Sequence, residues 1–169
     1  ADTLIDKFGP KHVQWAMLIA AFIVGIALFF EVGLVLLIPL VFTIAKRAKV
    51  SPLKLGLPMV TALSVTHGFL PPHPGPVVIA KELKANIGHV LLYGIIIAIP
   101  VTLIAGPVFN KFAQKLIPSA YTREGDISAL GSQKEFKASE MPSFGLSILT
   151  AVLPVILMLL STVVQLVTG

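Results

Sequence analysis

Long apolar runs, separated by short polar segments, make up most of this chain. Each run is about as long as, or longer than, the roughly 20 apolar residues that an α-helix needs to cross a bilayer. Lipid offers no hydrogen bonds to the backbone, so spans of this kind are helical. The pattern therefore predicts an all-α, polytopic membrane protein, with apolar runs over residues 13–45, 55–83, 88–109 and 144–167.

The first run is too long for one straight crossing. It has 33 residues and a single charge, Glu31. A helix of that length would measure about 50 Å, against a hydrocarbon core of about 30 Å. A break over Phe29–Gly33 would divide the run into two arms. We therefore predict a re-entrant helical hairpin over residues 13–45, with its tip at membrane depth.

The second run is interrupted by Thr66–Pro76, which holds four prolines, two glycines and two histidines. Proline lacks an amide hydrogen and disfavours helix in the residue before it, so this stretch should be extended or turned. Irregular backbone at membrane depth is tolerated only inside protein or beside a watery cavity. We predict a discontinuous helix over residues 55–83, resuming near Val77, with a candidate substrate site at its break.

The rest of the chain is expected to contain two simple crossings and a polar connection. Residues 88–109 read as one span, kinked at Pro100. Residues 110–143 carry five basic and four acidic residues and read as a hydrophilic linker, and residues 144–167 read as the last span. With the hairpin, eleven Lys and Arg residues fall on one side of the membrane and two on the other. The positive side, which includes the N-terminus and the linker, is expected in the cytoplasm.

The composition agrees with a membrane protein. Hydrophobic residues form 56% of the chain and charged residues 12%, with a mean hydropathy of +0.93. The net charge is +5, but the basic residues lie in short loops, so they indicate topology and not a nucleic-acid surface. There is no cysteine, which excludes disulfides and thiolate chemistry. Because the start at Ala1 resembles no signal peptide, we expect a fragment of a longer protein.

Three ionisable side chains are candidates for proton coupling: Glu31, His67 and His73. Glu31 is the one acidic residue inside an apolar run, where a charge costs about 2.5–3.5 kcal/mol unless it is paired or faces a cavity. Histidine, with an ordinary pKa of about 6.5, suits proton exchange. Two structural alternatives stay open, a permanently protonated Glu31 and neutral histidines that pin the coil. No third ligand accompanies the histidines, so we expect no metal and no cofactor.

The two breaks together favour an anion. The helix resuming near Val77 and a hairpin arm starting near Gly33 would both point positive dipole ends into one cavity. Free amides are expected at Gly75, Val77 and Val78. Glycine also lets a ligand approach the backbone closely. The predicted substrate-binding residues are Gly33, Thr66, His67, Gly68, Pro72, His73 and Gly75.

Several motifs carry a resemblance to a known family: Gly25–Gly33, Leu37–Phe42, Leu63–Pro76 with the string THGFLPPHPGP, and Glu140–Gly145. Together they resemble the gluconate permease family of bacterial proton symporters. The resemblance implies a multi-pass carrier of the bacterial inner membrane that imports gluconate or a related sugar acid with a proton. It also implies a wider superfamily of ion transporters, whose halves each hold a re-entrant hairpin and a broken helix, and a second half that completes the site.

Other functions compete with this interpretation. Relatives of such carriers take D-serine or other small hydroxy acids, and a non-transporting subunit or a channel could use the breaks as packing features only. An enzyme is not expected, because Ser64, Thr61 and Thr66 have no identifiable base beside them. The expected partners are a sugar acid, protons and the lipid bilayer. The sequence leaves the oligomeric state open, a homo-oligomer included.

Overall fold

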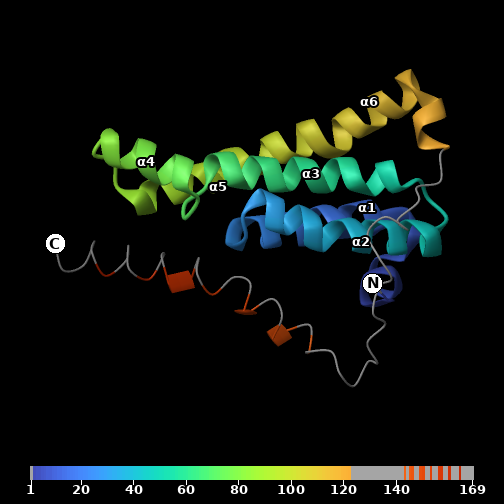
Figure 1. Cartoon of the computed structure of the whole chain (residues 1–169), viewed down its shortest axis with the longest axis horizontal. Helices are drawn as coiled ribbons and strands as arrows, with labels where there is room; N and C mark the ends of the chain where they lie inside the picture. Colours follow the sequence, from blue (N-terminus) through green and yellow to red (C-terminus); the bar gives the residue numbers. More distant parts are fainter. Residues whose placement is uncertain are drawn as a thin grey trace.

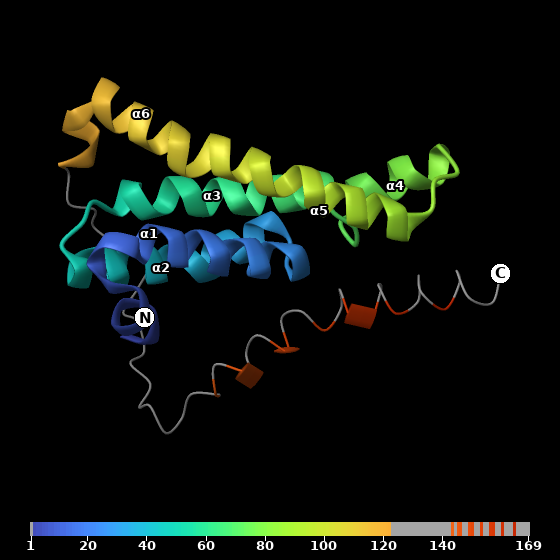
Figure 2. The same cartoon turned by 180° about the vertical axis from the view of Figure 1, so that it is seen from behind.

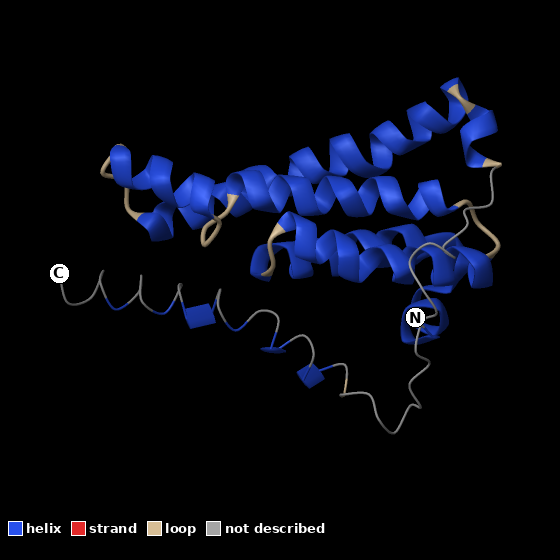
Figure 3. Ribbon diagram, in the orientation of Figure 1, coloured by secondary structure: helices blue, strands red, loops and turns tan. Residues whose placement is uncertain are grey.

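The computed structural model describes residues 2–122 and single positions between 143 and 164, and its regular elements there are all helices (Figure 3). The all-α prediction is therefore confirmed. Most of the predicted span 144–167 and most of the predicted linker 110–143 lie outside the described residues. The helices are α1 (Asp2–Ala27), α2 (Phe30–Ala48), α3 (Pro52–Phe69), α4 (Pro74–Glu82), α5 (Ile87–Leu103) and α6 (Phe109–Leu116). A π-helical turn η1 (Ile104–Val108) joins α5 to α6, and a 3₁₀ turn η2 (Pro118–Tyr121) follows α6.

Helix α3 is the central element of this part of the chain. Helices α1 and α2 reverse direction at Leu28 and Phe29 and lie side by side along one side of α3 (Figures 1 and 2). The path α5–η1–α6 runs along α3 on the other side (Figures 1 and 2). The reversal falls inside the apolar run, because the 33-residue run is too long to continue as one straight helix.

The N-terminal helix is longer than the sequence pattern predicts. Helix α1 begins at Asp2, before the predicted first arm at residue 13, and it is kinked at Gly9, where φ is 67°. Glycine adopts this left-handed conformation without the steric penalty of a Cβ atom. At the far end of the hairpin, Lys49 ends α2 in the same conformation, with its N–H donating to the carbonyls of Ala45 and Lys46.

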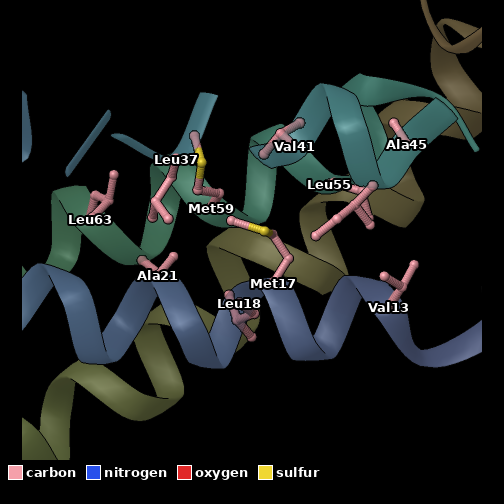
Figure 4. Close-up of a cluster of buried hydrophobic side chains, with 12 residues drawn as sticks. Val13, Met17, Leu18, Ala21, Leu37, Val41, Ala45, Leu55, Met59 and Leu63 are labelled. Atoms are coloured by element: carbon pink, nitrogen blue, oxygen red, sulfur yellow. The ribbon is translucent and has the colours of Figure 1, made fainter. Parts of the chain in front are cut away.

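The main apolar core lies where α1, α2 and α3 meet, and Figure 4 shows its side chains. In each helix the core positions recur every three or four residues, so each helix buries one face. Between helices in a bilayer, close packing and hydrogen bonds replace the hydrophobic effect as the cohesive interaction. The buried core residues are Val13, Met17, Leu18, Ala21, Leu37, Val41, Ile44, Ala45, Leu55, Met59, Ala62 and Leu63.

Asn110 lies in helix α6, at the start of the segment predicted as a hydrophilic linker. Pro58 has no amide hydrogen, so it leaves the carbonyl of Lys54, four residues earlier in α3, without its helical donor. Asn110 Nδ2 donates to that carbonyl at 2.8 Å, and Asn110 Oδ1 accepts from the Tyr121 hydroxyl at 2.6 Å. The side chain is 3% exposed. This network holds α6 and η2 against the start of α3.

Two helical paths among the described residues are long and apolar enough to cross a membrane. They run over Pro52–Glu82, which includes the break between α3 and α4, and over Ile87–Leu116. The second path passes the predicted exit at residue 109, because η1 carries Pro107 through a widened turn without ending the helix.

Gly25→Ala should destabilise the packing of α1 against α3. A Cβ at Gly25 would overlap the Thr66 hydroxyl and lie 3.3 Å from Leu63 Cα. Overpacking of this kind costs about 1–3 kcal/mol. The matched control is Gly56→Ala, because a Cβ there meets nothing closer than Val41 Cγ1 at 3.8 Å. Thermal unfolding of the complete protein can be monitored by size-exclusion chromatography of heated samples. The melting temperature should fall for Gly25→Ala only. Equal melting temperatures for the two variants would contradict this packing.

Asn110→Ala should lose more stability in the natural sequence than in a Pro58→Ala background. In the natural sequence it leaves the partly buried Lys54 carbonyl without a donor, which costs about 1–3 kcal/mol. In Pro58→Ala the restored amide at position 58 can donate to that carbonyl instead. A double-mutant cycle on thermal stability measures the difference. Additive losses would show that Asn110 does not compensate for the proline.

Candidate functional site

The turn of the α1–α2 hairpin lies directly against the break between α3 and α4. The Phe30 N–H donates to Nδ1 of His67 at 3.3 Å. Nε2 of His73 lies 2.8 Å from the Gly25 carbonyl, to which it donates. These bonds join residues 37 and 48 positions apart in the chain. We call the two segments, Gly25–Gly33 and Thr66–Pro76, the junction.

The break is shorter than the proline-rich stretch predicts. Only Leu70–His73 is non-helical, with a cis peptide between Pro71 and Pro72. The predicted site residues Thr66, His67 and Gly68 lie in the last turn of α3, and Gly75 lies in the first turn of α4. Proline is well suited to the first helical position, where no amide donor is needed, so Pro74 begins a helix.

Helix α4 therefore begins at Pro74 and not near Val77, which corrects the predicted amide donors. The Val77 N–H donates to the His73 carbonyl at 3.2 Å, and Val78 lies beyond the first turn. Pro74 and Pro76 have no N–H to offer. Gly75, which is exposed, supplies the free amide of this helix start.

Helix α2 begins at Phe30 and not near Gly33, which is a second correction. The Gly33 N–H donates to the Phe29 carbonyl at 2.9 Å. Gly33 is buried, and a Cβ there would lie 2.8 Å from Leu63 Cδ2. The observed role of Gly33 is thus close packing of α2 on α3, and its contact with substrate stays a prediction.

The two histidines and Phe29 form a cluster of rings at the junction. The centroids of His67 and His73 are 4.6 Å apart, and that of Phe29 lies 6.0 Å and 5.8 Å from them. His73 is 3% exposed, whereas His67 is half-buried. Because its Nδ1 accepts a hydrogen bond, His67 is the neutral tautomer with its proton on Nε2. His73 holds α1 to the break through its Nε2 proton.

The remaining predicted residues divide into a buried and an exposed set. Thr66 is fully buried, and its hydroxyl lies 2.9 Å and 3.0 Å from the carbonyls of Ala62 and Leu63 in its own helix. Its contact with substrate also stays a prediction. The exposed set consists of Glu31, Gly68, Pro72 and Gly75.

Two residues of the junction, Gly25 and Phe29, and one residue just before it, Ser64, were not among the predicted site residues. Gly25 supplies the carbonyl for His73 and the space for Thr66. Phe29 supplies the third ring of the cluster. Ser64 is exposed and lies one helical turn before His67 and Gly68. Its spacing of three and four residues from them is the signal that could have identified it.

A separate groove of about 850 Å³ lies between α2, α3 and η1, away from the histidines. Its lining is apolar except for Ser51 and Thr61, and it includes Ile38, Val60 and Ile104. A groove of this composition offers packing surface to apolar groups but little to a charged solute. The junction is therefore the candidate site.

Comparison with known proteins identifies the family of this chain. The chain matches the GntP family permease model over residues 1–169. It is 61% identical over 166 residues to a gluconate permease of Bacillus subtilis (strain 168), which covers 98% of this chain and 37% of that protein.

Two relatives from Escherichia coli (strain K12) are also similar. A high-affinity gluconate transporter is 51% identical over 170 residues, covering 99% of this chain and 37% of the relative. A Gnt-II system L-idonate transporter is 50% identical over 165 residues, covering 98% and 36%. The chain thus spans little more than a third of the length of the curated relatives it matches. No solved structure matches it.

The family match extends over the whole chain, and the identity to the relatives is far above what chance similarity gives. Members of this family are polytopic membrane transporters and not enzymes, as the apolar pattern and the missing catalytic set predict. The chain belongs to the GntP family of permeases.

Proposed function

We propose that this chain forms one half of the substrate site of a secondary carrier that imports gluconate or a related sugar acid with a proton. The observation that carries the proposal is the junction, where a helical hairpin turn and a helix break are joined by two hydrogen bonds, one accepted by His67 and one donated by His73. Broken helices that meet in this way are where transporters bind solutes. The similarity to a gluconate permease and to an L-idonate transporter supports a polyhydroxylated carboxylate as substrate.

The proposed placement in the membrane follows from the same geometry. The hairpin α1–α2 enters from the cytoplasmic side and returns, so the junction lies at membrane depth in the bacterial inner membrane. Residues 52–82 and 87–116 cross the bilayer. At that depth an exposed Glu31 must face a cavity and not lipid, because lipid gives a charged group no hydrogen bonds.

The proposed roles divide the junction by exposure. The exposed residues Gly68, Pro72 and Gly75 contact the substrate, while Glu31, His67 and His73 handle the proton. Glu31 lies in the first turn of α2, where the helix dipole favours a carboxylate. The remaining length of the permease supplies the facing half of the site.

Glu31→Gln should abolish proton-driven gluconate accumulation by the complete permease. Glutamine has the shape of glutamate but cannot exchange a proton, so net uptake should fall to the level of cells without the permease. Counterflow of labelled against unlabelled gluconate should persist, because exchange needs no net proton transfer. The matched control is Glu82→Gln, at the exposed end of α4. Normal accumulation in Glu31→Gln would refute the role of Glu31, and lack of counterflow in the wild type would indicate a channel or scaffold.

A further inference from the structure

We infer that His67 couples the proton to the substrate by exchanging the cap of helix α2: neutral His67 holds the Phe30 amide, and protonated His67 releases that amide to the substrate carboxylate. The inference deepens the proposed function and rests on it. It assigns to one side chain both the proton and part of the anion site.

The first step concerns the hydrogen bond itself. The Phe30 N–H donates to Nδ1 of His67 at 3.3 Å. A ring nitrogen accepts a hydrogen bond only while its lone pair is free, and both nitrogens of a protonated imidazole are donors. The bond therefore exists only with neutral His67, and a proton arriving at Nδ1 breaks it.

The second step concerns what this bond occupies. Phe30 is the first residue of α2, and its amide is one of the donors that a helix leaves unpaired at its N-terminus. Such amides bind anions, because the helix dipole adds to their partial positive charge. The hairpin turn supplies no side-chain cap of its own. Neutral His67 thus takes the place that an anion would occupy.

The third step follows when a proton adds to Nδ1. The Nδ1–H and the Phe30 N–H are then two neighbouring donors, and the two oxygens of a carboxylate can accept one bond from each. The carboxylate stays ionised and the imidazolium carries the proton, so the loaded site gains no net charge. Loss of the proton restores the lone pair on Nδ1. This nitrogen then accepts the hydrogen bond of the Phe30 N–H again and displaces the carboxylate. Proton and anion therefore bind and leave together.

The ionisable groups around His67 fit a single proton at this position. Glu31 follows Phe30 directly on α2 and is exposed. The His73 ring is 4.6 Å away, and two positive charges at that separation would repel each other. The end of α1 at residues 24–28 has no ionisable side chain. On α5, the ring of exposed His89 lies against Tyr93.

The test measures proton uptake when gluconate binds to the purified complete permease in weak buffer with a pH indicator. At alkaline pH the wild type should take up about one proton per gluconate, and its gluconate Kd should rise about tenfold per pH unit. His67→Asn places an amide oxygen near the position of Nδ1 but cannot take the proton. It should bind gluconate more weakly, take up no proton and lose the pH dependence of Kd.

The control for the histidine change is His89→Asn, which should behave as the wild type. Unchanged proton uptake in His67→Asn would overturn the inference. If His73→Gln lost the proton uptake while His67→Asn kept it, the proton would be assigned to His73 instead, which would also overturn the inference. If the wild-type protein bound gluconate without taking up a proton, the coupling of proton and gluconate at His67 would be refuted, but gluconate transport would not. Wild-type protein that does not bind gluconate would instead refute the proposed function.

A second pair of variants tests the amide without touching the histidine. Phe30→Pro removes the N–H at the first helical position, where proline fits, and Phe29 before it already has the extended ψ of 151°. Phe30→Ala loses the same ring but keeps the N–H. At low pH, Phe30→Pro should bind gluconate about tenfold more weakly than Phe30→Ala, as expected for one charge-assisted hydrogen bond. Equal affinities would overturn the inference.

Discussion

The hydrogen bonds between the two interrupted elements are the constraint on which the rest of the structure depends. A helix that ends away from water leaves backbone amides and carbonyls unpaired, and an unpaired buried group is costly. Here His67 satisfies the first amide of α2, and His73 satisfies a carbonyl near the end of α1. Both histidines come from the opposite break. The hairpin turn and the break between α3 and α4 therefore stabilise each other. Without the other segment, each would leave these polar groups without their hydrogen-bond partners.

The same pairing explains why small residues surround the junction. Gly25 and Gly33 let the hairpin approach Leu63 and Thr66 more closely than a Cβ would allow. On the other side of α3, a Cβ at Gly94 would lie 3.0 Å from the Phe69 carbonyl, so α5 also packs tightly against the break. Close packing of this kind replaces the hydrophobic effect between helices in lipid. It also fixes the histidine rings to within hydrogen-bonding distance of their partners.

Sequence reasoning could locate both interruptions, because run length, the position of Glu31 and the prolines each leave a local signal. It placed the helix starts several residues too late, near Gly33 and Val77, since it gave too little weight to proline as a first helical residue at Pro74. The long-range partners left no such signal. The bond from Phe30 to His67, and that from Asn110 to the carbonyl freed by Pro58, depend on which helix faces cross in space.

The same side chain thus serves the fold and the proposed site. The His67 ring caps α2 at the hairpin turn, and it is also an ionisable group in the proposed anion site. The most direct test is an electron cryomicroscopy structure of the complete permease with gluconate at low pH. We predict substrate density between the Phe30 amide and the His67 ring, with the His73 bond to Gly25 retained. Gluconate bound elsewhere, or a hairpin turn separated from the helix break, would contradict the pairing of the two interruptions as the transport site.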